Sequence, residues 1–225
     1  MLSLTDKWKA TYPGAGVGVL VMNGVSNPES VVDLDRRTSE IEEELRSRYA
    51  GADRAVIKAI PAIQEYNVFY KRFKKTYHVQ LQLESVILKK RPVPGMRALV
   101  KAMVSAELKN QLLTAGHDVG LLNGALTADV ATGEETYTRF GGQEQQLKRG
   151  DKFISDGTGI VSSVIYGPDS RTSIRDRTTH VCFTVYVVQG IEAATVAAHL
   201  NDIRDHVLLA APGAEVEQLE VVICE

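Results

Sequence analysis

The sequence has few of the features that hold small secreted proteins together. It contains two cysteines in 225 residues, Cys182 and Cys224, which lie far apart with no partner at metal-binding spacing. Both stand among apolar residues, so we expect them to be buried thiols in strands. A chain of this length buries enough apolar surface to fold without disulfides or a structural metal. Stability therefore gives no hint of function.

Long apolar runs and an excess of one charge are also missing. The longest apolar stretch, Val181–Val188, is far shorter than the roughly 20 residues that a membrane-spanning helix needs. The 26 lysines and arginines against 28 aspartates and glutamates leave a formal net charge of -2, which argues against a polybasic membrane or nucleic-acid coat protein. Asp6 and Lys7 occupy the part of the chain where a secretory signal would be apolar. We expect a cytoplasmic protein with no membrane partner.

The periodicity of apolar residues predicts an α+β fold. Helical spacing is found at residues 6–12, 27–51, 61–77, 79–90, 96–110 and 191–209. Alternating or short apolar runs between glycine turns predict strands at residues 16–21, 126–130, 136–140, 152–155, 160–166, 180–188 and 219–223. This order predicts one domain over residues 1–225, with a mixed, largely antiparallel sheet and helices packed on one face.

Two patterns that could bind a cofactor or metal do not fit their usual context. Gly14, Gly16 and Gly18 lie before or at the start of the strand predicted over residues 16–21, whereas a dinucleotide loop follows a strand and opens a helix. His199 and His206 lie two turns apart on one helix, too far for one ion, and are expected on a solvated stripe. We expect no cofactor and no metal site.

Two glycine-flanked segments could carry chemistry. Gly116-His117-Asp118 and Gly141-Gly142-Gln143-Glu144 each place a titratable side chain beside a residue that allows a sharp turn. Such groups can orient water or read a polar group of a substrate. Hydrogen bonding within a turn explains Asp118 equally well.

A basic segment lies at the end of the second long helical pattern. Lys71, Arg72, Lys74 and Lys75 interleave with aromatic residues between Tyr70 and Tyr77. Four cations beside rings could contact phosphates and stack on bases. The rings also have the spacing of a buried helix face, so a solvated basic face over a core is the alternative.

The order of several short motifs resembles a known family. The motifs are Arg91-Pro92-Val93, the helix Leu99–Leu108, the His117-Asp118 turn, Phe140–Glu144, Leu147-Lys148, Phe153–Gly157, and Ile165–Gly167 followed by Ser170 and Thr172. In this order they resemble the editing domain of the bacterial phenylalanine-tRNA ligase β chain, which reads R-P-[IV], a helix, L-H-A-F-D, L-D-G-T-E, L-V-I-A-D and I-[FM]-G-G. The resemblance covers residues 79–188 and leaves residues 1–78 as a helix-rich N-terminal extension.

The resemblance implies a mixed α+β unit that hydrolyses tyrosine wrongly attached to tRNA for phenylalanine. Glu144, two residues after Gly142, matches the glutamate that reads the tyrosine hydroxyl, while Ser162 and Ser163 match the strand that floors the pocket. Ser162-Ser163 lacks the G-x-S-x-G turn of a serine nucleophile. With Asp118 aligned to the family aspartate, the family histidine falls at Ala115, so His117 could serve only through a shifted turn.

Three functions remain open at this point. The first is a free-standing relative of the editing domain that binds aminoacyl-tRNA or its acceptor end, as a deacylase if His117 or Asp118 orients water. Such a chain has no room for the ATP-dependent apparatus of a complete tRNA ligase. The second is a module or enzyme that binds a small ligand, such as an amino acid, in the same pocket without tRNA. The third is a non-catalytic interaction domain.

Overall fold

The computed structural model describes residues 2–224. The helices are α1 (Asp6–Thr11), α2 (Val32–Arg48), α3 (Arg54–Lys58), α4 (Pro61–Lys71), α5 (His78–Ile87), α6 (Ala98–Asn110), the 3₁₀ turn η1 (Val119–Leu121) and α7 (Ala193–Ala210). The strands are β1 (Leu2–Leu4), β2 (Gly16–Asn23), β3 (Thr114–Asp118), β4 (Leu126–Val130), β5 (Thr136–Thr138), β6 (Glu144–Gln146), β7 (Lys152–Ser155), β8 (Ile160–Ser163), β9 (Gly167–Pro168), β10 (His180–Val187) and β11 (Glu215–Ile223).

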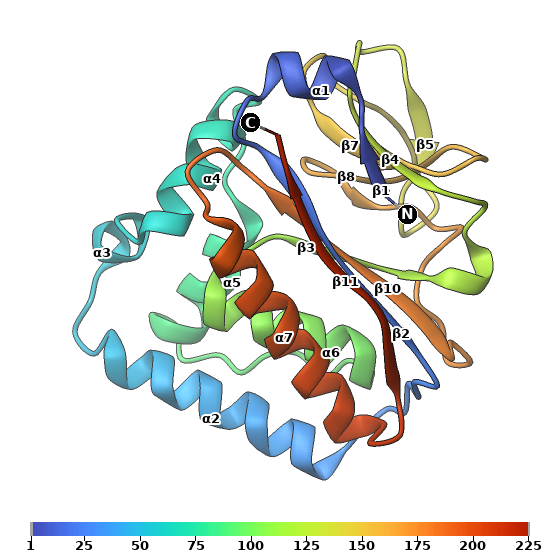
Figure 1. The fold of residues 1–225 in the computed structure, drawn as a ribbon. Helices are drawn as coiled ribbons and strands as arrows, with labels where there is room; N and C mark the ends of the chain where they lie inside the picture. Colours follow the sequence, from blue (N-terminus) through green and yellow to red (C-terminus); the bar gives the residue numbers. More distant parts are fainter. Residues whose placement is uncertain (1, 225) are drawn as a thin grey trace.

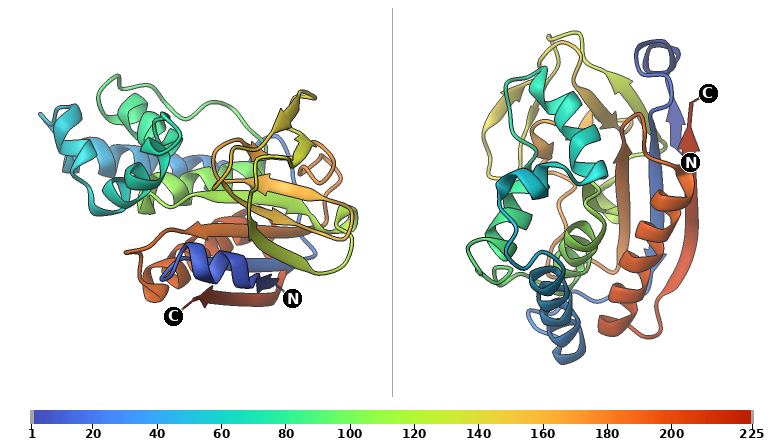
Figure 2. Two further views of the ribbon diagram at one scale, coloured as in Figure 1. Left: turned by 90° about the horizontal axis from the view of Figure 1, so that it is seen from above. Right: turned by 90° about the vertical axis from the view of Figure 1, so that its left-hand side faces the viewer.

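A four-stranded antiparallel sheet, in the order β11-β2-β10-β3, forms the middle of the molecule. The helices α2, α5, α6 and α7 lie on one side of it, and a five-stranded sheet in the order β1-β4-β7-β8-β9 lies on the other (Figure 1; Figure 2). On the helical side, a side-chain carbon at Gly18 would stand 2.6 Å from Val196 of α7. On the opposite side, the Tyr186 hydroxyl meets the Ser162 hydroxyl at 2.7 Å. The expected α+β class, with its mixed and largely antiparallel sheets, is confirmed.

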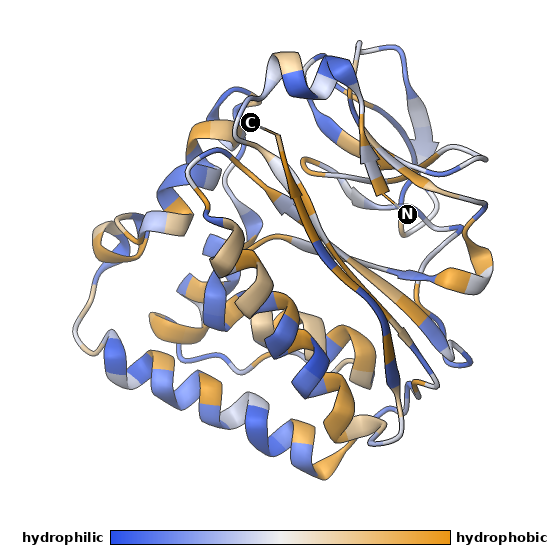
Figure 3. Cartoon of the chain, viewed as in Figure 1, coloured by the Kyte–Doolittle hydropathy of each residue, from blue (hydrophilic) through white to orange (hydrophobic). Residues whose placement is uncertain are grey.

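The hydropathy of the chain follows this arrangement. Strands of the four-stranded sheet are largely hydrophobic, whereas α2 on the outside is largely hydrophilic (Figure 3). The buried residues of α2 are spaced at three or four positions and include Leu34, Ile41 and Leu45. Ile41 and Leu45 belong to a small apolar cluster shared with α5 and α6, which is the burial expected of an amphipathic helix.

The first 78 residues are part of both sheets. β1 pairs in parallel with β4, and β2 is hydrogen-bonded on both edges, to β10 and β11. The segment expected to be an N-terminal extension therefore shares its sheets and its hydrophobic core with the residues that follow it.

The start of α2 differs from the expected one. Asn27 does not cap this helix, which begins at Val32 after Val31. Its side chain instead accepts a hydrogen bond from the Leu99 amide at 3.0 Å and donates one to the Arg175 carbonyl at 2.9 Å. Asn27 therefore supplies a cap to the start of α6, a contact between segments distant in sequence.

The helix expected over residues 61–77 is shorter, and a turn over residues 72–77 separates it from α5. α4 ends at Lys71, and Lys74 has a positive φ of 56°. The Lys75 amide bonds to the Tyr70 carbonyl and the Lys74 amide to the Lys71 carbonyl, which is the hydrogen-bond pattern of a Schellman C-cap. Phe73 and Tyr77 are still buried, so the spacing of the rings identified core residues but not the break.

Two further expectations concern buried side chains, and one concerns membrane-spanning helices. Cys182 and Cys224 are free, buried thiols, as expected. His199 and His206 are buried rather than solvated, because α7 packs against both the sheet and α6. None of the helices within residues 2–224 is long and apolar enough to cross a membrane.

Candidate functional site

His117 and Asp118 lie in strand β3, not in a turn. His117 is completely buried and pairs across the sheet with Cys182. Adjacent residues of a strand point to opposite faces, so the two side chains do not form one site. The shifted turn considered for His117 is not formed, because residues 114–118 are a strand.

His117 is held in one orientation. Its Nδ1 lies 2.8 Å from the Thr172 hydroxyl, which in turn donates to Asp169. Since the hydroxyl has a single proton, it accepts one from Nδ1 and leaves Nε2 as a free acceptor. Burial, with a smaller effect of Arg171, lowers the pKa of His117 to about 4. Within residues 2–224 its Nε2 has no hydrogen-bond partner. The ring is a neutral base shielded from solvent.

Both carboxylate oxygens of Asp118 have structural partners. Oδ1 accepts from the Gly120 amide at 2.9 Å and caps η1, while Oδ2 accepts from the Thr178 hydroxyl at 2.7 Å. The local hydrogen bonding that was the alternative explanation of this residue is therefore present.

Glu144 lies on the exposed hairpin of β5 and β6, opposite Thr138. It lines neither the cavity bordered by Tyr12, Arg72 and Lys152 nor any of four further cavities formed by residues 2–224. Gly142 is in the turn of the same hairpin with a φ of 86°. A hairpin of two three-residue strands outside both larger sheets leaves its polar side chains in solvent. The geometry gives no support for Glu144 as the group that reads a substrate hydroxyl.

Ser162 and Ser163 are buried in β8, and both hydroxyls bond to protein groups. Ser162 meets Tyr186 across the two sheets, and Ser163 donates to Asp151 at 2.6 Å. Burial raises the pKa of Asp151 to about 7, although the bond from Ser163 opposes the shift. These serines connect the layers rather than line an open pocket.

The four cations Lys71, Arg72, Lys74 and Lys75 form what we call the basic turn, between α4 and α5. All four are exposed, and none forms an ion pair with any residue in the described range. Arg72 lies over the Tyr12 ring at 5.7 Å and Lys75 over the Tyr166 ring at 4.8 Å. These two charged groups rest on ring faces, and because all four side chains are exposed they remain accessible to solvent or an anion.

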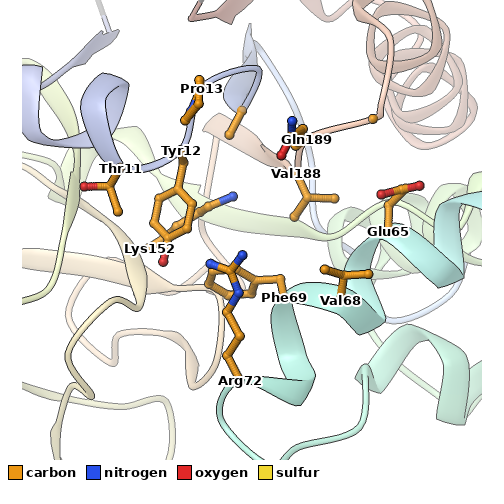
Figure 4. A pocket seen from close by; sticks show the side chains of 12 residues that line it. Thr11, Tyr12, Pro13, Glu65, Val68, Phe69, Arg72, Lys152, Val188 and Gln189 are labelled. Atoms are coloured by element: carbon orange, nitrogen blue, oxygen red, sulfur yellow. The ribbon is translucent and has the colours of Figure 1, made fainter.

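A cavity of about 350 Å³ opens beside the basic turn, between α1, α4 and the loop after β10 (Figure 4). Its wall includes Arg72 and Lys152, and we call it the Lys152 cavity. It is lined by Thr11, Tyr12, Pro13, Ala15, Glu65, Val68, Phe69, Arg72, Lys152, Val188, Gln189 and Gly190. Figure 4 shows Tyr12, Lys152 and Arg72 grouped together, with Glu65 away on the other side.

Lys152 is the most unusual group in this cavity. The residue is only 1% exposed, and its ammonium lies 4.6, 4.8 and 5.4 Å from the ring centres of Tyr12, Phe69 and Trp8. Burial and the neighbouring Arg72 guanidinium lower the pKa of Lys152 to about 7. Three aromatic rings around a cation partly replace its lost hydration. We refer to these three rings as the aromatic cage.

The aromatic cage is assembled from distant parts of the chain. The Thr5 side chain accepts from the Trp8 amide and starts α1, which presents Trp8 and, just after its end, Tyr12. Phe69 comes from α4, and Lys152 is the first residue of β7. Sequence reasoning missed this site because Lys152 reads only as the start of a strand. The usable signal was a lysine directly before the apolar pair Phe153-Ile154.

Comparison with known proteins finds similarity to a solved structure but none to a family model or a curated protein. No protein-family model matches the sequence, and no curated protein matches it. Among solved structures, the chain is similar to an N-terminal fragment of the phenylalanyl-tRNA synthetase β-subunit from Pyrococcus horikoshii, with a TM-score of 0.50 and 11% identity. The match covers 96% of this chain and 50% of that one, so the chain spans about half the length of the fragment. The likeness concerns the fold.

Proposed function

We propose that this chain is a free-standing protein that binds aminoacyl-tRNA at its acceptor end. The basic turn meets the phosphates, residues 1–225 act as one domain, and binding takes place in the cytoplasm. The observation that supports this proposal is a turn of four exposed cations without acidic partners in residues 2–224. It occurs on a fold similar to part of a tRNA synthetase subunit.

The backbone of the basic turn adds a second argument. Lys74 adopts a positive φ, a conformation that glycine adopts without penalty and lysine does not. Strained positions tend to be kept where they serve a function. Lys74 is exposed at this C-cap, so the turn presents four exposed cations within residues 71–75.

Ester hydrolysis is a separate extension of the proposal. His117, with Nδ1 tied to Thr172 and a free Nε2, has the hydrogen bonding of a general base. Its complete burial means that a substrate could reach it only if the two sheets separated locally. We therefore propose binding as the function and treat deacylation by His117 as an outcome to be measured.

The binding proposal is tested by titrating bulk tRNA, charged and uncharged, at several salt concentrations. The double variant Lys74→Glu, Lys75→Glu should weaken binding at least tenfold and reduce the salt slope, since each phosphate contact contributes about 0.7 to 0.9 to that slope. The matched control is Lys89→Glu, Lys90→Glu, which makes the same charge change at the far end of α5. Equal losses in both variants, or no retention of tRNA by the native chain, would overturn the proposal.

Deacylation is tested by incubating the protein with tRNAs charged with each amino acid in turn. If the native protein releases the labelled amino acid from one tRNA species and His117→Gln does not, hydrolysis is added to the function. Glu144→Ala is included because the family resemblance gives Glu144 the role of reading the side chain. Its exposed position predicts no change in either binding or cleavage.

The Lys152 cavity favours a second candidate function, a module that binds a small ligand without tRNA. Its volume of about 350 Å³ lies within the range of small-molecule sites. If neither tRNA nor small ligands bind, the remaining reading is a non-catalytic interaction domain.

A further inference from the structure

The Lys152 cavity holds a buried cation without a counter-ion. Within residues 2–224 the Lys152 ammonium makes neither a hydrogen bond nor an ion pair, although the residue is almost completely buried. A buried charge is costly unless it is paired. The aromatic cage compensates for part of this cost, because each cation–π contact is worth about 0.5 to 2 kcal/mol. An anionic ligand that contacts the Lys152 ammonium would offset the remaining cost of burying its charge.

The nearest acidic side chains do not fill this role. Asp151 immediately precedes β7 and its attraction opposes the fall in the Lys152 pKa, but it forms no ion pair with Lys152 and accepts a hydrogen bond from Ser163. Glu65 lies on the other side of the cavity, where its carboxyl group approaches the backbone of Gly190 (Figure 4). The cationic wall is thus open to an anion from outside.

A second cation strengthens the attraction at the same place. Arg72 lies over the Tyr12 ring at 5.7 Å, and Lys152 lies over the same ring at 4.6 Å. Arg72 is exposed at the entrance, whereas Lys152 is deep. An oxyanion entering past Arg72 therefore approaches a second positive group at the bottom, in a setting where charge-assisted hydrogen bonds are strong.

We propose that the Lys152 cavity binds a small ligand through a carboxylate or phosphate group that contacts Lys152. Arg72 assists at the entrance, and the body of the ligand packs against Val68, Phe69 and Val188, which line the same cavity. Glu65 repels a second negative charge on the far side of the ligand.

This site is distinct from one for an aminoacyl ester. An amino acid attached to RNA has a free ammonium group and no carboxylate, so a buried lysine would repel it. The oxyanion has two sources: a nucleotide phosphate or a free carboxylic acid. Binding of either one returns the pKa of Lys152 toward its usual value and takes up a proton above pH 7.

The sole tryptophan of the sequence, Trp8, provides the readout because its ring lies 5.4 Å from the Lys152 ammonium. Trp8 fluorescence is followed during titration with inorganic phosphate, acetate and the neutral isostere acetamide at constant ionic strength. We expect a saturable change with at least one oxyanion and none with acetamide. AMP and butyrate then distinguish the nucleotide source from the free acid by which of them binds more tightly.

The variants make the test specific. Lys152→Met should weaken oxyanion binding at least tenfold, Arg72→Gln should weaken it several-fold, and the exposed control Lys148→Met should leave it unchanged. Arg72 is on the surface, so its variant tests the site even if Lys152→Met fails to fold. No saturable change with either oxyanion, or undiminished binding in both Lys152→Met and Arg72→Gln, would overturn the proposal.

The oxyanion site and the tRNA proposal can fail independently. Lys74→Glu, Lys75→Glu should reduce tRNA binding and leave the phosphate or acetate titration within twofold of the native protein. Lys152→Met should weaken phosphate or acetate binding and leave tRNA binding unchanged, since the Lys152 ammonium is buried and out of reach of an extended RNA backbone.

Discussion

Replacing Lys152 by methionine should make the protein more stable below pH 7. The pKa of Lys152 falls from 10.5 to about 7 on folding, which at about 1.4 kcal/mol per pH unit corresponds to roughly 5 kcal/mol of destabilisation by the charged form. Contacts with the aromatic cage offset part of this, at about 0.5 to 2 kcal/mol per ring. Methionine keeps the unbranched shape and gains sulfur–aromatic contacts. We expect the free energy of unfolding at pH 6 to rise by about 1 to 3 kcal/mol.

The pH dependence separates this effect from a change in packing. Because the pKa of Lys152 is lower in the folded state, the unfolded chain binds more protons between pH 7 and 10.5, and the stability of the native protein rises across that interval. Lys152→Met lacks this rise. Its advantage should therefore be largest at pH 6 and shrink above pH 7 by up to about 1.4 kcal/mol per pH unit.

The assay is urea unfolding followed by circular dichroism at pH 6 and pH 9, in a buffer free of phosphate and carboxylates. Lys148→Met is the control for loss of an exposed lysine from the segment before β7. An identical stability difference between Lys152→Met and the native protein at both pH values would refute the reasoning, since the effect would then come from packing alone.

Three other expectations follow from single residues. Lys74→Gly should raise the free energy of unfolding by about 1 kcal/mol in thermal or urea unfolding, because glycine adopts the positive φ without strain, and it should weaken tRNA binding by removing one cation. The pKa of His117 is about 4 when folded against an ordinary 6.5, so native stability is lost as pH falls through that interval; in His117→Gln the slope of unfolding free energy against pH should be smaller by up to about 1.4 kcal/mol per pH unit. Glu144→Ala should change the melting temperature by less than about 2 °C, as expected of an exposed surface substitution; a larger fall would show that the Glu144 side chain itself stabilises the hairpin.

The periodicity of the sequence was a good guide to which residues are buried and a poorer guide to how the backbone connects them. Phe73 and Tyr77 are core residues, as their spacing indicated, but α4 ends before both of them and α5 begins only at His78. A Schellman turn at Lys74 has no glycine to mark it. In the same way, the glycine before His117 suggested a turn, whereas Gly116 lies within β3, where a side chain would collide with Ile174.

The candidate site was harder to predict than the fold, because its parts come from different elements. Lys152 becomes unusual only when Trp8, Tyr12 and Phe69 surround it, and nothing local in the sequence connects these four residues. Glu144 shows the opposite case, a motif-like segment that the structure leaves on an exposed hairpin. The cations of the basic turn could be identified from sequence, since exposure follows from their position around buried rings.

The pairing of β2 has a consequence for how the protein is made. Gly16 of this strand pairs with Ile223 of β11 on one edge and with Val187 of β10 on the other. When the ribosome has delivered β2, neither neighbour has yet been synthesised, so the strand waits with both hydrogen-bonding edges open. The four-stranded sheet can therefore form only late in synthesis. Until then, an incomplete nascent chain exposes a valine-rich strand with unpaired backbone groups, which favours binding by chaperones.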